Sequence, residues 1–211
     1  MNGDDRGMTH TPVFQTVLGD ADWQRLGAVV RRHYGLRPRS EDHMTVRGRM
    51  DEVWHAPWAA LLMPAGRLFG ALVPHTGRDV PIEVNYRCRP QDAGLYWDRC
   101  FHFEGQPVFH FRSHMTVADA ARHEVVEWVR FGLGLRLRVT AEEGALVFRD
   151  VGYVWRIGRL QLPLPLHLLL GRAHVEERPV PGDAGAFTMK MAIGHPLWGE
   201  VFRYSGRFRL D

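Results

Sequence analysis

From Pro81 onward, apolar and polar residues alternate along most of the chain, which is the period of a strand with one buried face. Ile82, Val84 and Tyr86 share one face, whereas the residues between them are polar or charged. The same alternation returns in later segments that are separated by turn residues, and no long helical segment stands between them. The pattern therefore predicts strands joined by hairpins in an antiparallel sheet.

The spacing of the turns predicts about nine or ten strands. The fold class that follows is mainly β (α+β): a curved antiparallel sheet or barrel with an N-terminal helix and one or two short inserted helices. Neither a repeat nor a low-complexity linker divides the chain. We therefore expect a disordered tail at 1–12 and a single antiparallel β-rich domain at 13–211.

Two segments before residue 81 have a different pattern. Residues 20–35 predict a helix, with Asp20 as its N-cap and Gly35 at its C-terminal end. Residues 57–73 begin with a proline that suits a first helical turn, and they are apolar nearly all round. We expect this second helix to cover the core, and the alternatives are a lid over a cavity or peripheral contact with a membrane. A further short helical or irregular stretch is expected at 165–170.

The glycine in the segment 104–106 allows a tight hairpin, and its register can be predicted. Trp97 then lies opposite Ser113 on one face, and Asp98 lies opposite Arg112 on the other. One face is aromatic and the other carries an opposite-charge pair, whereas a slip of one residue would mix the two faces. The same register gives the pairs Phe101–Phe109 and Cys100–His110.

Three charged residues fall on strand faces that otherwise consist of apolar side chains: Arg99, Asp150 and Glu200. The hairpin at 142–144 places Asp150 opposite Leu135. Buried charges are costly unless they are paired, and they are concentrated at functional sites. One interpretation is structural: Arg99 forms a core ion pair with one of the two carboxylates, or it extends its charged end to solvent at the edge of the sheet. The other is a cavity inside the curved sheet.

In such a cavity, Arg99 would hold an anionic head group such as a carboxylate, and aromatic side chains would surround the apolar part of the ligand. The candidate ligand-binding residues are Arg99, Asp150, Glu200, Trp97, Phe101, Phe109, Phe111 and Phe148.

Composition and charge exclude several classes of function. The net charge of +3 comes from arginine, since Lys190 is the only lysine, and no dense basic cluster predicts nucleic-acid binding. Cys88 and Cys100 lack the spacing of a zinc site. His110 and His114 lie about 13 Å apart on a strand, so a solvated polar face is favoured over a metal site. Isolated thiols and the lack of an apolar leader predict a soluble, cytoplasmic protein.

Motifs for nucleotides and for nucleophilic catalysis are also missing. The sequence has no GxGxxG after a strand, no P-loop and no GxSxG elbow. No cofactor is therefore expected, and an enzyme is the less favoured class.

Several stretches resemble a bacterial domain of unknown function, family 4166. The resemblance extends from about Phe14 to Leu210, and no reaction is attached to that family. It is carried by residues 97–101 with Gly105, Phe109 and Ser113, by residues 134–146, and by residues 162–165 with Glu176, Phe187, Pro196, Gly199, Tyr204 and Gly206.

Three hypotheses about function remain. The first is a non-enzymatic binder of a small apolar or amphipathic molecule, such as a lipid-like ligand with an anionic head. The second is an accessory or interaction domain with a solid core. The third is an enzyme that uses a buried pair of Arg99 and Asp150. The volume of the interior separates the second hypothesis from the other two.

Overall fold

A computed structural model describes residues 10–210 of the chain, so most of the tail expected at 1–12 lies outside the described residues. Eleven strands form one antiparallel sheet in the order β6-β5-β4-β3-β2-β1-β11-β10-β9-β7-β8. Their bounds are β1 His43–His55, β2 Gly77–Arg87, β3 Leu95–Phe101, β4 Phe109–Asp119, β5 Glu124–Trp128, β6 Leu133–Glu142, β7 Ala145–Ile157, β8 Leu160–Leu164, β9 Arg172–Val180, β10 Asp183–His195 and β11 Gly199–Leu210.

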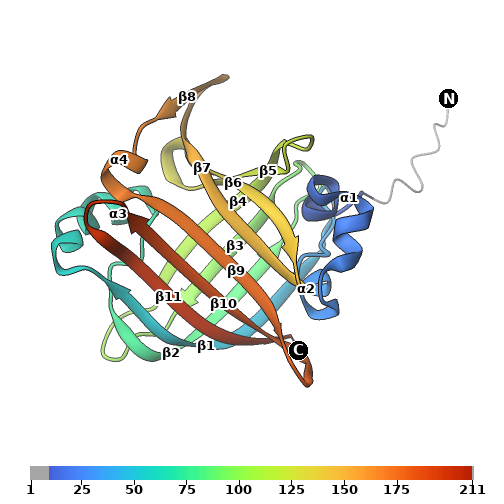
Figure 1. Cartoon of the computed structure of the whole chain (residues 1–211), viewed down its shortest axis with the longest axis horizontal. Helices are drawn as coiled ribbons and strands as arrows, with labels where there is room; N and C mark the ends of the chain where they lie inside the picture. Colours follow the sequence, from blue (N-terminus) through green and yellow to red (C-terminus); the bar gives the residue numbers. More distant parts are fainter. Residues whose placement is uncertain (1–9, 211) are drawn as a thin grey trace.

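An additional pairing between β6 and β7 closes the sheet into a barrel (Figure 1). Ten strands form the barrel, and β8 lies outside it because it pairs only with β7. The prediction of a curved antiparallel sheet or barrel is confirmed. The sequence did not predict β8, in which Pro163 interrupts an apolar run. An outer strand tolerates a proline because one of its edges needs no hydrogen-bond donors.

Two helices cover one end of the barrel (Figure 1): α1 (Val13–Arg25) and α2 (Ala28–His33). The prediction of one helix at 20–35 is wrong in two respects. Helical structure begins at Val13, with a break at Gly19, whose φ is 76°. A second break falls at Gly27, where a Cβ would lie 2.3 Å from the ring of Pro179. The close contact with the barrel therefore needs a glycine between the helices.

The opposite end of the barrel carries the short helices η1 (Pro57–Leu62), α3 (Met63–Phe69) and α4 (His167–Leu170). The first of these is a 3₁₀ helix, so the helix expected at 57–73 is shorter and irregular. It is also not buried all round, because Leu61 is 85% exposed and Leu68 is 58% exposed. Among the described residues, none of the helices combines the length and apolar character needed to cross a bilayer.

The barrel wall includes a close contact between β1 and β11 that requires glycine. A Cβ at Gly48 would lie 2.5 Å from the carbonyl oxygen of Arg207 and 2.6 Å from the ring of Phe208. The ring of Phe208 thus occupies the space that a side chain at position 48 would need.

We expect Gly48→Ala to lower the free energy of unfolding by about 1–3 kcal/mol, because the methyl group overpacks this contact. Gly194→Ala is the matched control, since open space surrounds the position that a Cβ would take on that strand glycine, and it should change stability by less than about 0.5 kcal/mol. Urea denaturation of the two variants measures the difference. Equal losses of stability would contradict the packing argument.

Candidate functional site

The barrel contains a cavity of about 430 Å³, lined mostly by apolar side chains from its strands. Tyr34, directly after α2, lines the cavity at the helix-covered end and is itself buried. At the other end the lining includes Trp155 and Leu169, which are 40% and 50% exposed. The cavity therefore reaches the molecular surface at the end that carries α3 and α4.

A buried arginine stands in the wall of this cavity. The guanidinium of Arg99 donates hydrogen bonds to Ser113 Oγ (3.0 Å) and to Glu127 Oε1 (3.1 Å). Ser113 donates its hydroxyl to the same carboxylate oxygen at 2.6 Å. The guanidinium also lies over the rings of Trp97 and Phe111, at 4.3 and 4.9 Å from their centroids. Such contacts stabilise a cation that has lost its water.

The charge of Arg99 is maintained in this apolar interior. Burial alone would lower the pKa of Arg99, but the nearby charge of Glu127 opposes burial and the pKa is raised overall. A buried ion pair is favourable only when its desolvation is offset by good geometry and further hydrogen bonds. Ser113 and the two aromatic rings provide that support, so the charged cluster is compatible with the barrel interior.

A second pair of ionisable groups lies at the helix-covered end. His33 Nδ1 is 3.1 Å from Glu177 Oε2, although the angles are not those of a hydrogen bond. The imidazole stacks between Tyr34 and Phe187, with ring centroids 4.3 and 4.6 Å away. Within the described part of the chain, Trp97 Nε1 is likewise buried without a hydrogen-bond partner. Such groups gain free energy from any partner that reaches them.

Four buried tyrosines complete the polar part of the lining: Tyr34, Tyr86, Tyr153 and Tyr204. Burial raises the pKa of all four hydroxyls, and it raises that of Tyr204 to about 12. The negative charge of Glu177 raises the pKa values of Tyr34 and Tyr86 further. These side chains therefore stay protonated and are able to donate hydrogen bonds at neutral pH.

A comparison with known protein families matches residues 26–208 to the family described as "Domain of unknown function (DUF4166)". The chain belongs to this family. The match includes α2 and nearly all of the barrel, which confirms the resemblance found in the sequence. No curated protein matches the chain. The family description attaches no reaction to a DUF4166 domain, so its chemistry has to be argued from the cavity.

The barrel of this DUF4166 domain brings most of the predicted aromatic residues together around the cavity. The register predicted for β3 and β4 is confirmed. Phe109 belongs to that hairpin but packs at the margin of the core rather than in the cavity lining. The predicted ligand-binding residues that line the cavity are Arg99, Trp97, Phe101, Phe111 and Phe148.

Asp150 does not meet Arg99. It lies opposite Leu137 rather than Leu135, in the continuous register that runs from the two-residue turn 143–144, and the register shift between Arg136 and Leu137 comes only after this pair. Its carboxylate accepts backbone N–H groups from Gly152 (2.7 Å) and from residue 173 (3.2 Å). Burial raises the pKa of Asp150, and these two hydrogen bonds oppose the rise. The side chain of Asp150 thus links the backbones of β7 and β9.

Glu200 lies on the outer surface of this DUF4166 domain, where it pairs with Arg203. The register of β10 and β11 shifts between Ile193 and Gly194, so the alternation expected around Glu200 is interrupted there. Val201 is buried beside Phe202 instead. The prediction that Glu200 would share a buried strand face with its neighbours is therefore wrong.

The two glutamates of the cavity, Glu127 and Glu177, were not predicted from the sequence. Glu127 stands between Val126 and Trp128, which are both buried in a smaller cluster on the opposite face of β5. The neighbour of Glu177 is Glu176, so two adjacent charges conceal which one faces inward. The inward position of Glu127 could have been found by pairing β5 with the predicted β3–β4 hairpin, because Ser113 and Glu127 then lie on the same inner face.

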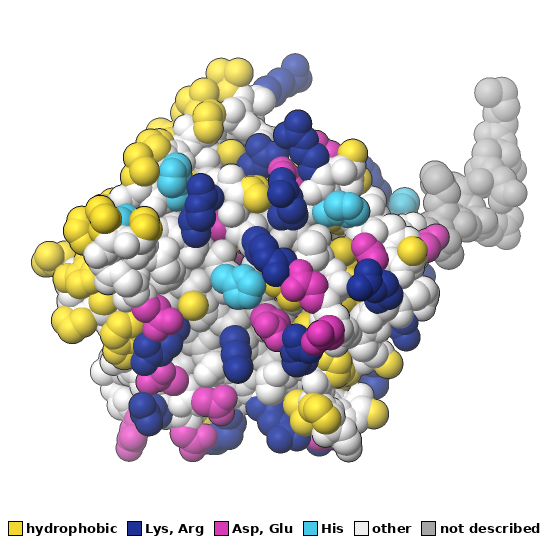
Figure 2. Space-filling model, in the orientation of Figure 1, with side chains coloured by type: hydrophobic (Ala, Val, Ile, Leu, Met, Phe, Trp, Pro, Cys, Tyr) yellow, Lys and Arg dark blue, Asp and Glu magenta, His cyan; other side chains and the backbone are white. Residues whose placement is uncertain are grey.

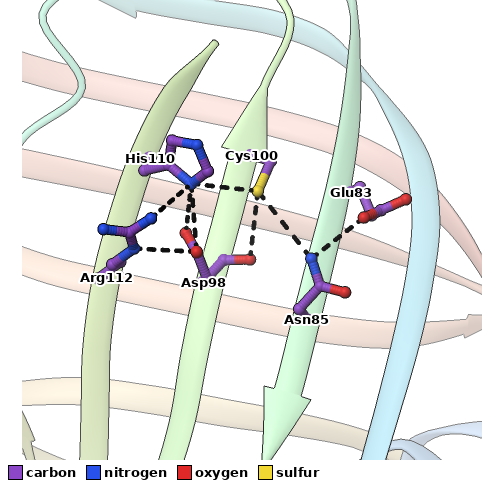
Figure 3. Close-up of polar contacts among 6 residues, drawn as sticks. All are labelled: Glu83, Asn85, Asp98, Cys100, His110 and Arg112. Carbon is purple, nitrogen blue, oxygen red and sulfur yellow. Dashed lines mark hydrogen bonds and ion pairs between the residues drawn. The ribbon is translucent and has the colours of Figure 1, made fainter.

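The outer face of the β3–β4 hairpin carries a different polar cluster (Figure 3). His110 Nδ1 lies 2.9 Å from Asp98 Oδ1 and 3.4 Å from Cys100 Sγ, which are all ligand types for a metal ion. However, Arg112 donates to Asp98 at 2.9 Å, and its Nη2 lies 3.2 Å from the same His110 nitrogen. The guanidinium of Arg112 therefore already supplies the positive charge that a metal ion would bring to this cluster. The arrangement fits the solvated polar face expected from the sequence.

The Arg99–Glu127 pair predicts a non-additive effect on stability. We expect Glu127→Ala to lower the free energy of unfolding by about 3–5 kcal/mol, because it leaves the buried guanidinium unpaired. The double variant Arg99→Met/Glu127→Leu should lose less than the sum of its single variants. A double-mutant cycle by chemical denaturation measures the coupling. The same cycle at Arg112 and Asp98 on the outer face should give less than about 1 kcal/mol.

The buried tyrosines predict a loss of stability in alkali. The unfolded chain releases a tyrosine proton near its ordinary pKa of about 10, whereas folded Tyr204 holds it to about pH 12. This contribution to stability is therefore complete below about pH 10 and is lost as pH rises toward 12. We expect Tyr204→Phe to reduce the slope of stability against pH in this range by about 1.4 kcal/mol per pH unit.

Denaturant titrations at several pH values between 9 and about 12 test this expectation, with Tyr86→Phe/Tyr204→Phe as a graded comparison. The double variant should reduce the slope further than the single one. An unchanged slope in both variants would show that these hydroxyls titrate alike in the folded and unfolded states.

Proposed function

We propose that this DUF4166 domain binds a small apolar or amphipathic molecule inside its barrel. The observation that carries the proposal is the cavity of about 430 Å³ with its open end. Small-molecule sites have volumes of roughly 300–1,000 Å³ and are lined by apolar side chains with a few placed polar groups. The interior matches that description, with Arg99 and the buried tyrosines as the polar groups.

The pairing of charges suggests which head group the site prefers. Arg99 faces Glu127, and His33 faces Glu177, so each basic group already has an acidic neighbour. An anionic head, which the sequence suggested, would add a negative charge without a free cation to receive it. A neutral head with a hydroxyl or amide meets better partners. It accepts from Trp97 Nε1 or from a tyrosine, and a hydroxyl also donates to Glu177.

Two other interpretations of the domain have less support. A purely structural or interaction domain would fill its interior, since voids forfeit packing energy. An enzyme built on Arg99 and Asp150 would need the two side chains to converge. Instead, Arg99 pairs with Glu127, and the Asp150 carboxylate accepts backbone N–H groups.

The proposal is tested by native mass spectrometry of the purified domain after incubation with dodecanol or with dodecanoate, two probes that differ in their head group. We expect a one-to-one complex with dodecanol and weaker binding of dodecanoate. Val175→Phe should weaken dodecanol binding at least about tenfold, because Val175 lines the cavity and a larger side chain fills it. Val117→Phe is the matched control, since Val117 is exposed on β4.

Circular dichroism spectra of both variants establish that they are folded. Failure of the folded wild-type domain to bind either probe, or equal binding by the Val175→Phe variant, would contradict the proposal. Tighter binding of dodecanoate than of dodecanol would support ligand binding in the cavity, but it would favour the anionic head group expected from the sequence over a neutral one.

A further inference from the structure

Exposed apolar side chains gather at the open end of the barrel (Figure 2). They belong to four parts of the chain, namely 57–69, Phe131, 155–169 and 197–198, which we call the apolar rim. Only Val108 and Val117 among the exposed large apolar residues of the described chain lie elsewhere. Monomeric proteins rarely expose so many large apolar side chains together unless the surface binds something.

Contacts between the four segments make the rim one continuous surface. The ring centroids of Trp58 and Trp198 lie 6.3 Å apart, which joins η1 to the β10–β11 turn. Those of Phe69 and Phe131 lie 5.9 Å apart, and Trp155 Nε1 donates to the carbonyl of Phe131 at 2.9 Å. The helices α3 and α4 and the strand β8 accordingly lie around the same end of the barrel, away from α1 and α2 (Figure 1).

The rim also surrounds the mouth of the cavity. Phe69, Trp155 and Leu169 belong to the rim and line the cavity as well. Whatever covers the rim is therefore in contact with the opening of the cavity.

The charged residues within the rim segments have a single sign, and Glu200, which follows the last segment, is paired with Arg203. Residues 56–73, 129–134, 155–172 and 195–199 contain no aspartate or glutamate, but they contain five arginines. Arg67 and Arg159 are exposed and form no hydrogen bond or ion pair within the described chain. On the barrel wall, by contrast, several exposed arginines pair with carboxylates, as Arg49 does with Asp79.

We propose that the apolar rim docks on the surface of a membrane that contains anionic phospholipids, with the mouth of the cavity facing the acyl chains. Apolar side chains would enter the interface, tryptophans would lie at the level of the head groups, and arginines would contact phosphates. A second copy of this chain is a poorer occupant, because a symmetric contact would bring like-charged arginines together. This inference rests on the proposed function, since it makes the bilayer the source of the ligand.

The docking surface extends beyond the segment 57–73 that the sequence suggested for membrane contact. That segment provides a single arginine, Arg67. The remaining basic residues come from η2 (Arg130–Gly132), from the β7–β8 hairpin and from the start of β9, so only the folded barrel assembles the complete surface.

The experiment is flotation of the full chain with phosphatidylcholine vesicles that contain or lack phosphatidylglycerol. We expect the wild-type protein to float with the anionic vesicles and much less with the neutral ones. Arg67→Glu/Arg159→Glu should weaken binding at least about tenfold, since each basic residue near the surface contributes to the attraction. Arg87→Glu/Arg122→Glu is the matched control, with the same change of net charge on exposed residues outside the rim.

A second variant tests the apolar contribution. Leu61→Ser/Leu160→Ser/Leu168→Ser changes three exposed rim residues that do not line the cavity. It should also bind anionic vesicles at least about tenfold more weakly. Val108→Ser/Val117→Ser is its control and should bind as the wild type does.

Measuring dodecanol binding in the same variants without vesicles separates this inference from the proposed function. We expect every rim variant to bind the probe as the wild type does. Wild-type protein that binds dodecanol but does not float would overturn the docking proposal alone. Protein that floats but binds no probe would overturn the ligand-binding proposal alone. A concentration-dependent dimer that the serine variant abolishes, without flotation, would identify a second copy as the occupant and overturn membrane docking.

Discussion

The pairing of β6 with β7 closes the sheet, and the remaining features of the molecule depend on that closure. A closed barrel satisfies the backbone hydrogen bonds of every wall strand and has no free edges. Its diameter grows with the number of strands, and about eight strands already give an interior that side chains just fill. Ten strands therefore leave a space that side chains alone do not fill, unless many are large. The cavity is in this sense a consequence of the strand count.

Polar groups in such an interior are restricted to places where they find partners. Arg99 is held by Glu127, Ser113 and two aromatic rings, each from β3, β4 or β5. Three consecutive antiparallel strands thus assemble the cluster through their register alone. A one-residue slip would turn the guanidinium and the carboxylate to opposite faces, so the ion pair and the register support one another.

The sequence predicted the parts of the fold that depend on regular alternation. The β3–β4 register was predictable because aromatic and charged residues separate cleanly between the two faces of that hairpin. Glu200 was misplaced because a bulge shifts the register beside it, and regular alternation does not reveal where a bulge falls. Asp150 was placed opposite the wrong residue because the β6–β7 turn has two residues and is shorter than expected. Glu127 was missed because β5 is buried on both faces, which removes the polar alternation. Long-range pairs such as His33 with Glu177 depend on packing between distant segments.

One end of the barrel is closed by packed aromatic rings, whereas the other is open and apolar, so the cavity is accessible from one end. At one end, α2 places His33 and Tyr34 inside the barrel, where aromatic stacking and the neighbouring Glu177 fix them. A ligand entering there would have to displace packed rings, which costs free energy. At the other end, the lining passes into exposed apolar side chains without a change of chemistry. The ligand that we propose would enter through this end with its head first, and it would reach the polar groups inside while its chain stays in apolar surroundings.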